Sequence, residues 1–428
     1  MGSAAPRAVV LADSDSRWKW AASVARELAP GHALDARFMR TASAPTARQI
    51  AEVGIVPDTS GWTDCAEFVR DPAVAGADLL VLGTTGGTVL SLLHSLRVTR
   101  DEGRPRPVVV TGYVGVVYEN MVDGLLLRAG SDIVLANSAH DAERFREVYD
   151  ALGLERDCVV EAGLPFLGGA PHDPSAAGDT RPFTVCFAVQ PSVPAGRAAR
   201  AGLLARLQRH ARTHPDREVL VKLRNKPGEA VTHTERHSYQ LLYEELPSPP
   251  ENLKLVYGDM GEVLDRTDLL VTVSSTAAVE AIHRGIPTAI LTDFGVREAH
   301  GNHYFLRSGC LASWAELDAG LVPTASPEWA RRHGVGLGDP YRAARDRLAA
   351  LRSAGALPPL RPYYTQERAG DYLAQLLERR GLDLLGRPLP HPADAAGTAM
   401  RRLVRRGAGG LYRVGRQRVA PMIRRWAQ

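Results

Sequence analysis

The sequence is poor in cysteine and in long hydrophobic runs. Its 428 residues include only four cysteines, Cys65, Cys158, Cys186 and Cys310, which lie far apart and form no CxxC pair. Structural disulfides and zinc motifs are therefore not expected, and we interpret these cysteines as reduced core thiols. No apolar run approaches the roughly 18 residues that are needed to cross a bilayer. The start lacks a signal peptide, since "DSDS" interrupts the short "AVVLA" run, so we expect a cytoplasmic protein.

Acidic residues are missing from the end of the chain. From Thr398 to Gln428 there are nine arginines and no acid, so the rest of the chain, whose total is +4, carries −5. Leucine, valine, tyrosine and tryptophan interleave with these arginines, a pattern typical of segments on anionic lipid at the inner face of a membrane. A solvated tail, or one packed on its own body, remains the alternative. Nucleic acid is not expected as a partner, because the excess of basic residues is confined to the tail and no aromatic stacking motif accompanies basic residues in the body of the chain.

The rest of the chain reads as two α/β domains. With 45% hydrophobic and 23% charged residues the composition is that of a globular protein, and 428 residues are too many for one core. Short apolar runs such as "RAVVLA" and "ADLLVLG" alternate with helical patterns, which indicates parallel sheets. A segment rich in Pro, Gly and small residues separates two such series. The predicted units are a domain over 1–166, a linker over 167–182, a domain over 183–390 with its final helix at about 363–380, and a basic tail over 391–428.

Three consecutive hydroxyl side chains mark one strand–helix junction, in "LLVTVSSTAAVEAIHRGIPTAIL". Ser274, Ser275 and Thr276 follow the apolar run, and Gly285 ends the helical pattern after them. One hydroxyl is enough to cap a helix, whereas three at the carboxyl edge of a parallel sheet suit a phosphate group. We therefore predict phosphate binding here, with capping alone as the alternative.

Basic residues alternate at the end of another strand, in "VLVKLRNKPGE". Lys222, Arg224 and Lys226 would lie on one side if the strand continued, where they would neutralise a phosphate or a sugar acid. The alternative is an ordinary solvated strand end.

These two stretches, in this order, resemble the C-terminal domain of GT-B glycosyltransferases. The resemblance covers about residues 183–311 and is strongest to the capsule group: polysialyltransferases, Kdo transferases and CDP-glycerol glycerophosphotransferases. That group has a Lys-x-His-Pro motif and a later Ser-Ser or Ser-Thr motif, both of which bind the donor phosphate. Ser274 and Ser275 match the second motif, whereas Arg224 stands where the first has histidine, and Pro227 comes three residues later. Arginine stabilises phosphate charge but is a poor proton donor.

The resemblance extends to the layout of the whole chain. The opening "VVLADSDSRWKW" looks like that of an actinobacterial glycosyltransferase family of undefined donor. It implies a GT-B fold, in which two Rossmann-like domains face each other across a cleft and the nucleotide donor lies on the C-terminal one. We also assign Glu280, Asn302 and His303 to donor binding, with local hydrogen bonding as the alternative for the last two. The His-x-x-His spacing at His300 lacks a helix that would place both rings on one face, so no metal site is expected.

The N-terminal half supplies the candidates for catalysis and for the acceptor side. An inverting transferase needs a carboxylate that takes the proton of the acceptor hydroxyl. Asp15 and Asp13 follow the first strand and are candidates, with Asp15 projecting further; Glu119 is a third candidate. Helix capping or a solvated helix start is the alternative for each. The turn "GTTGG" lacks a Walker lysine and is expected to let a substrate approach the backbone closely. The acceptor-side residues are Lys19, Thr84, Thr85, Gly86, Gly87, Tyr118 and Asp123.

The sequence therefore predicts an inverting, metal-independent glycosyltransferase without a cofactor. It would transfer a sugar from a nucleotide donor, with CMP or CDP favoured, to a hydroxyl of a glycan or lipid-linked acceptor in the synthesis of surface glycans. A sugar-nucleotide 2-epimerase and a non-catalytic protein that binds sugar nucleotides or glycans are the alternatives, because fold alone does not separate these functions.

Overall fold

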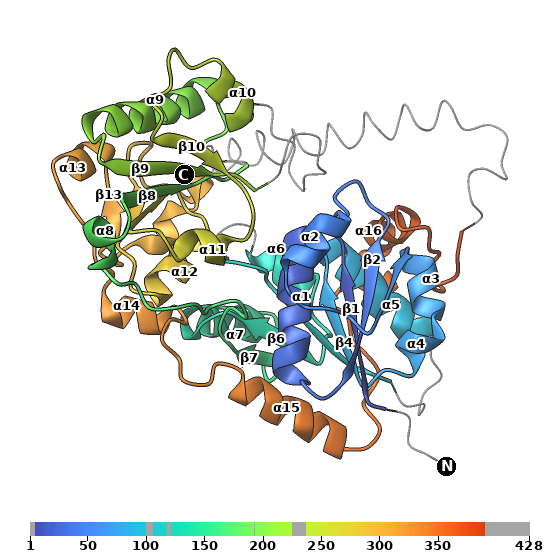
Figure 1. Ribbon diagram of the computed structural model, residues 1–428. Coiled ribbons are helices and arrows are strands. Elements are labelled where there is room, and N and C mark those ends of the chain that lie inside the picture. The colour runs from blue at the N-terminus through green and yellow to red at the C-terminus, as the bar shows by residue number, and fades with distance from the viewer. Residues whose placement is uncertain (1–4, 100–105, 118–120, 192, 225–236, 390–428) are drawn as a thin grey trace, which may run out of the picture.

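Two parallel β-sheets form the framework of the protein (Figure 1). The computed structural model describes residues 5–99, 106–117, 121–191, 193–224 and 237–389. Tyr118, Glu119, Lys226 and the basic tail over 391–428 lie outside the described residues. In the part of the chain that is described, no helix is both long enough and apolar enough to span a membrane. The four cysteines are buried and unpaired, as expected.

The first sheet is built from the N-terminal part of the chain, and its neighbouring strands all pair in parallel. Its order, β3-β2-β1-β4-β5-β6-β7, reverses direction between β1 and β4. The strands are β1 (Arg7–Ala12), β2 (Ala33–Met39), β3 (Thr59–Thr63), β4 (Leu79–Gly83), β5 (Val108–Gly112), β6 (Ile133–Ala136) and β7 (Val159–Glu161).

Helices cover both faces of this sheet because its strands are apolar on both sides. In β1, Ala8 and Val10 face one hydrophobic cluster, whereas Val9 and Leu11 face another. The helices are α1 (Asp15–Leu28), α2 (Ala47–Glu52), α3 (Cys65–Arg70), α4 (Pro72–Ala75), α5 (Gly86–Thr99), α6 (Met121–Leu126) and α7 (Ala139–Ala151). Trp18 and Trp20 of α1 are fully buried against the first of these clusters.

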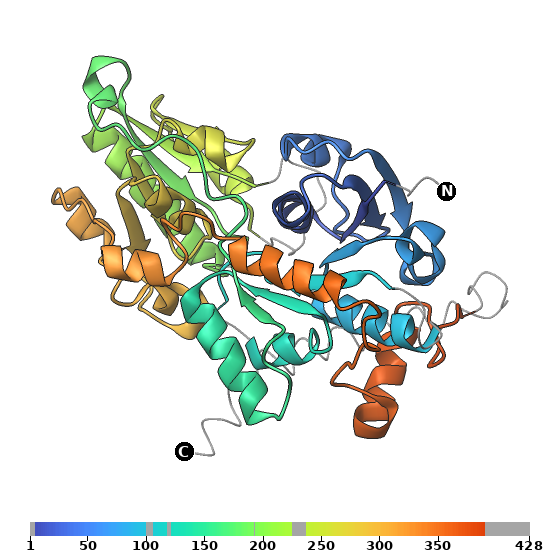
Figure 2. The ribbon, with the colours of Figure 1, turned by 90° about the horizontal axis from the view of Figure 1, so that it is seen from below.

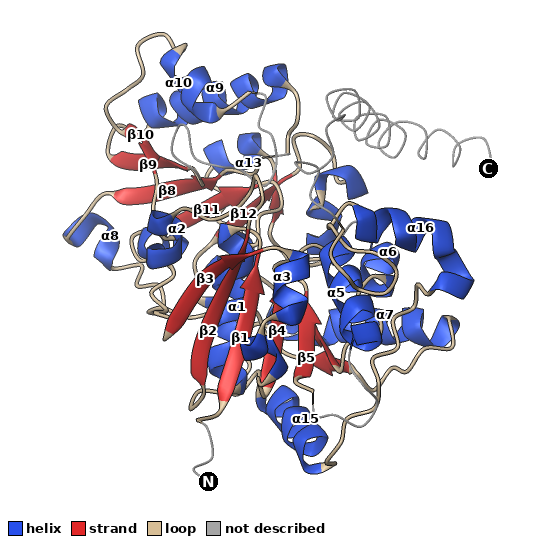
Figure 3. Ribbon diagram, turned by 90° about the vertical axis from the view of Figure 1, so that its right-hand side faces the viewer, coloured by secondary structure: helices blue, strands red, loops and turns tan. Residues whose placement is uncertain are grey.

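The second sheet has the order β10-β9-β8-β11-β12-β13, again parallel throughout and again reversing beside its first strand (Figure 3). Its strands are β8 (Phe183–Ala188), β9 (Arg217–Lys222), β10 (Leu253–Val256), β11 (Leu269–Thr272), β12 (Thr288–Leu291) and β13 (Leu311–Ala312). The helical segments of this part are α8 (Ala176–Asp179), α9 (Arg197–Thr213), α10 (Tyr239–Glu244), α11 (Met260–Leu264), α12 (Ala277–His283), η1 (Glu298–His300), η2 (Asn302–Phe305), α13 (Trp314–Asp318) and α14 (Pro327–Arg332).

The last two helices return to the first sheet, which corrects one predicted boundary. Helix α15 (Arg342–Ser353), orange in Figure 2, contacts β5, β6 and β7. Helix α16 (Gln366–Glu378) packs on α5, and its Leu373, Leu376 and Leu377 join the cluster that holds Val9 and Leu11. This final helix was predicted to belong to the second domain. Its apolar face instead completes the core of the first.

The chain therefore crosses between the two halves twice, and the two crossings touch. The hydroxyl of Tyr341, just before α15, donates to the carbonyl oxygen of Gly163 at 3.0 Å. Nearby, Gly334 has a φ of +83°, and a Cβ there would lie 2.4 Å from the carbonyl oxygen of Asn137. Only glycine fits this close contact between the returning segment and the first half.

Candidate active site

A cavity of about 410 Å³ lies between the two halves, at the carboxyl ends of strands from both sheets. Residues after β1 and β5 line it from one side, and residues that end or follow β8, β9, β10 and β11 line it from the other. Doubly wound sheets bind their ligands at this edge, near the reversal of strand order. Eight of the predicted residues line the cavity: Asp15, Lys19, Lys222, Arg224, Ser274, Ser275, Thr276 and Glu280.

The three hydroxyl residues after β11 have different surroundings. The Ser274 hydroxyl donates to the carbonyl oxygen of His300 at 2.5 Å and accepts from Gln190 Nε2 at 3.0 Å. The Ser275 hydroxyl, one residue before the N-cap Thr276, accepts from the amide of Ala277, the first residue of α12, at 3.2 Å. Thr276 faces the other half, where its hydroxyl would lie 2.5 Å from a Cβ on Gly115. Ser274 therefore organises the loop, Ser275 bonds at the start of α12, and the Thr276 hydroxyl lies nearest the opposite wall.

The basic strand end reaches the cavity, although β9 stops at Lys222. Lys222 is buried, and its ammonium group donates to the carbonyl oxygen of Leu223 at 2.9 Å. Burial lowers the pKa of Lys222, because a charged ammonium loses hydration there. Arg224 is more exposed and forms an ion pair with Asp15, its Nη2 lying 3.0 Å from Asp15 Oδ1. Both cations can therefore meet an anion in the cavity.

Glu280 adds a buried carboxyl group to the wall of the second half. It lies in α12, one turn beyond Thr276, and is 8% exposed. Burial raises its pKa to about 7, and the charge of Asp259 acts in the same direction, while Lys19 opposes it. A carboxyl group with this pKa exchanges protons near neutral pH and can bond to ligand hydroxyls in either state.

Two side chains of α1 connect the halves across the cavity. Asp15 begins the helix and pairs with Arg224 as described. Lys19, one turn later, pairs with Asp259, the N-cap of α11, at 3.1 Å between Nζ and Oδ2. Its ammonium group also lies 5.2 Å from the centre of the Phe166 ring. Lys19 was assigned to the acceptor side, and the structure shows it bound to the opposite half.

Asp13 is the other base candidate among the described residues, and its carboxylate makes structural contacts. It is 4% exposed, and its Oδ1 accepts from Arg17 Nη1 at 2.7 Å. Its Oδ2 accepts from the backbone amide of Thr85 at 3.1 Å. Asp13 thus joins the loop after β1 to the turn after β4, and it was expected to open onto the cleft instead.

The "GTTGG" turn serves packing where substrate approach was expected. Thr84 is buried, and the hydroxyls of Thr85 and Thr88 lie 3.1 Å apart at the start of α5. A Cβ on Gly86 would lie 2.9 Å from Leu127 Cδ1, and one on Gly87 would lie 3.1 Å from Leu376 Cδ1. The space beside these glycines is filled by the protein itself, so they allow the start of α5 to pack closely.

The remaining predicted residues lie elsewhere. Asn302 is fully buried; its amide donates to the carbonyl oxygens of Leu291 and Gly295, and its Oδ1 accepts from the amide of Arg297. It shapes the loop after β12, and His303 beside it is partly buried in η2. Asp123 is exposed in the first turn of α6. Tyr118, Glu119 and Lys226 are outside the described residues.

Sequence reasoning missed several residues of the cavity wall. Gln190 follows β8 and bonds to Ser274 through both ends of its side chain, with Oε1 accepting from the Ser274 amide at 2.7 Å. Asp259 and Phe166 also line the cavity. The position of Gln190 after a buried strand was a usable signal, whereas isolated Asp259 and Phe166 stand in no recognisable pattern.

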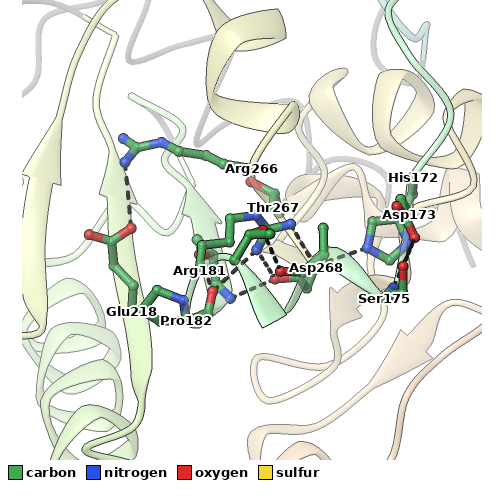
Figure 4. A network of polar contacts seen from close by, with 12 residues as sticks. His172, Asp173, Ser175, Arg181, Pro182, Glu218, Arg266, Thr267 and Asp268 are labelled. Carbon is green, nitrogen blue, oxygen red and sulfur yellow. Dashed lines mark hydrogen bonds and ion pairs between the residues drawn. The ribbon is translucent and has the colours of Figure 1, made fainter. Parts of the chain in front are cut away.

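A second polar cluster lies on the linker side of the second sheet (Figure 4). Asp268, which precedes β11, is 1% exposed and accepts from both Nη atoms of Arg181, from the Thr184 amide and from His172 Nε2 at 3.1 Å. Arg181 and the amide of Thr184 outweigh burial and lower the pKa of Asp268. This cluster fastens the linker to the amino end of the sheet, opposite the cavity.

Metal ligands do not assemble at the cavity. Among the residues that the structure describes, His, Cys, Asp and Glu side chains form no group of three or more that could hold a metal ion.

Comparison with solved structures shows the GT-B fold. A UDP co-structure of MnaA from S. aureus aligns with a TM-score of 0.53 and 11% identity, covering 82% of this chain and 96% of that chain. UDP-GlcNAc 2-epimerase from Neisseria meningitidis, bound to UDP-GlcNAc, aligns with a TM-score of 0.47 and 12% identity. The alignment covers 81% of this chain and 99% of that chain. The spinosyn rhamnosyltransferase SpnG aligns with a TM-score of 0.41 and 14% identity. The alignment covers 82% of this chain and 98% of that chain. At such identities the likeness shows the fold alone.

Comparison of sequences shows the family. No curated protein matches this chain. One family model, however, matches it over residues 8–351. Because this match spans most of the chain, the protein belongs to the glycosyltransferase family described as "Putative glycosyltransferase (DUF6716)".

Proposed function

We propose that the protein transfers a sugar from a nucleotide donor to an acceptor hydroxyl, with inversion and without a metal ion. One observation carries this proposal. In the cavity between the halves, Lys222, Arg224 and the hydroxyls of Ser275 and Thr276 come from the second sheet, and the carboxylate of Asp15 comes from the first. Groups that can bind an anion and a carboxylate that can accept a proton therefore line the same cavity of about 410 Å³.

The second half would hold the donor. Lys222 and Arg224 would neutralise the phosphate oxygens, and Ser275 and Thr276 would donate hydrogen bonds to them. As the bond between the sugar and the phosphate breaks, negative charge grows on the leaving phosphate, and prearranged cations and hydroxyls stabilise it. Glu280 is placed to bond to hydroxyls of the ribose or sugar.

The first half would activate the acceptor. Asp15 would take the proton of the acceptor hydroxyl as its oxygen attacks the anomeric carbon, while the nucleotide leaves with the electron pair of the broken bond. General-base removal typically costs a factor of about 10²–10⁴ in rate. For the acceptor we propose a glycan or a lipid-linked hydroxyl, and for the nucleotide CMP or CDP, in line with the Ser-Ser resemblance.

A panel of nucleotides tests the donor side. CMP, CDP, UDP, GDP and ADP are each titrated in a thermal-shift assay; UDP belongs in the panel because MnaA was solved with it. One of them should raise the melting temperature with concentration, since it binds only the native state. Lys222→Gln and Arg224→Gln should each abolish most of that rise, and Arg156→Gln, which changes an exposed side chain outside the cavity lining, should not. A melting temperature that none of the five nucleotides raises would contradict the proposal.

Transfer itself is tested with the matching sugar nucleotide. Release of nucleotide should depend on acceptor and should fall by about 10²–10⁴ in Asp15→Asn. A sugar-nucleotide 2-epimerase is the second candidate, favoured by Glu280, whose pKa of about 7 suits proton exchange in the same cavity as Asp15. Incubation of the sugar nucleotide in D₂O separates the two, because an epimerase exchanges the proton at C2 without an acceptor.

A further inference from the structure

Two ion pairs from one helix join the halves at the cavity. Asp15 and Lys19 lie one turn apart on α1, and they reach Arg224 and Asp259 of the second half at 3.0 and 3.1 Å. All four residues line the cavity. The side chain of Asp15 is 24% exposed and that of Arg224 is 36% exposed, so solvent and small ligands reach this pair.

This pairing removes positive charge from the place where an anion would bind. The described lining contains three cations, Lys19, Lys222 and Arg224. Carboxylates of the protein already neutralise Lys19 and Arg224, and Lys222 donates to a backbone carbonyl. A phosphate that enters the cavity thus meets an arginine whose guanidinium is occupied by Asp15.

We propose that Asp15 is the internal counter-ion of Arg224 in the nucleotide-free protein and that the donor phosphate displaces it. This inference rests on the proposed function. A partly exposed ion pair between side chains is weak, because water screens it. A phosphate carries more charge and offers paired oxygens that match the fork of a guanidinium, so it competes well for Arg224.

Displacement links the two substrates. While Asp15 is bound to Arg224, its carboxylate accepts from a cation and is poorly placed to accept a proton from an acceptor hydroxyl. Once the phosphate holds Arg224, Asp15 is released at the first turn of α1, facing the same cavity. The donor therefore binds first and frees the base, and the Lys19–Asp259 pair keeps α1 beside the second half during the exchange.

Affinities for nucleotides with and without phosphate test this exchange. CDP, UDP, cytidine and uridine are titrated calorimetrically into the full-length protein. Asp15→Asn removes the competing carboxylate, so it should tighten binding of the nucleotide by about 3- to 10-fold and leave the matching nucleoside unchanged. Asp15→Ser provides the same test with a different side chain. Arg224→Gln should weaken binding of the nucleotide. In the Arg224→Gln background, adding Asp15→Asn should not tighten this binding.

A control separates exchange from a general change in charge. Glu52 is another carboxylate of the cavity lining, and it pairs with Arg48 of its own helix. Glu52→Gln should change nucleotide affinity less than 2-fold. Equal gains in Glu52→Gln and Asp15→Asn, a gain that persists without Arg224, or no gain at all would overturn the inference while leaving the proposed function intact. A wild-type protein that binds neither CDP nor UDP would instead contradict the proposed function, and the inference with it.

Discussion

At the scale of single residues, Glu280 of the cavity wall should make the stability of the protein depend on pH. Its pKa is raised by burial from 4.5 to about 7 in the folded protein. The folded state therefore holds the proton more tightly than the unfolded state does. The resulting stabilisation is fully present below about pH 4.5 and is lost as the pH rises through about 7; it amounts to roughly 3 kcal/mol.

Replacing Glu280 by Gln should flatten this dependence. The free energy of unfolding of the wild type, measured with denaturant between about pH 5 and pH 8, should fall with rising pH, whereas that of Glu280→Gln should fall much less. Glu52→Gln, which alters a more exposed carboxylate of the same lining, should keep the wild-type slope. Parallel slopes in wild type and Glu280→Gln would show that Glu280 titrates normally.

The two serines after β11 should respond differently to substitution. Ser274→Ala removes the hydroxyl partner of the His300 carbonyl and of Gln190 Nε2, while Gln190 Oε1 keeps the Ser274 amide, and it should cost about 1–3 kcal/mol of stability. Ser275→Ala removes the hydrogen bond to the first amide of α12 and should cost only about 1 kcal/mol. Nucleotide affinity, measured by calorimetry, should fall more in Ser275→Ala than its stability loss would explain. Unchanged affinity in Ser275→Ala would leave this hydrogen bond as the whole role of the hydroxyl.

Sequence alone found the cavity residues that follow buried strands, because the carboxyl ends of parallel strands meet at one edge. Asp15, Lys222 and Ser275 belong to that group. It favoured Asp15 over Asp13 because Asp15 projects further past the strand, but it did not predict that Asp13 is held by Arg17 and by the Thr85 amide. Those contacts depend on how the turn after β4 packs, and no local pattern reports it.

At the scale of elements, the alternation of strands and helices was predictable and the destination of the last helix was not. Buried strands appear as short apolar runs, and the parallel α/β units inferred from them are confirmed, as is the GT-B fold that the resemblance implied. The sequence pattern of α16 predicts an apolar face but does not predict which sheet that face covers. Likewise, the glycines after β4 indicate a close approach without showing whether a ligand or the protein makes it.

A substitution in α16 should therefore destabilise the first half. Leu373 is fully buried beside β1 and α5, so Leu373→Ala should cost about 2–5 kcal/mol. Hydrogen exchange should accelerate in peptides from β1 and β4 before it does in peptides from β8 and β11. Tyr372→Ala, at an exposed position of the same helix, should have a much smaller effect. Faster exchange confined to the second half would contradict the packing described here.

At the scale of the whole molecule, charge is distributed very unevenly along the chain. The nine arginines after Thr398 belong to the segment outside the described residues, and the prediction for them rests on sequence. Deleting residues 401–428 should abolish pelleting with vesicles that contain phosphatidylglycerol, while nucleotide binding stays within 2-fold. Vesicles of phosphatidylcholine alone should pellet neither form. Equal pelleting of both forms with anionic vesicles would exclude the tail as the membrane contact.

The double crossing between the halves has a consequence for engineering. Because the chain enters the second half after Gly163 and leaves it before Tyr341, that half is an insertion within a discontinuous first half. Its two junctions lie within hydrogen-bonding distance of each other, as in hosts that tolerate domain insertion. The second half can thus be exchanged between relatives as a single segment with two adjacent splice points. A chimera with a single splice point would instead take α15 and α16 from the other parent. The core of the first half would then combine residues of both parents.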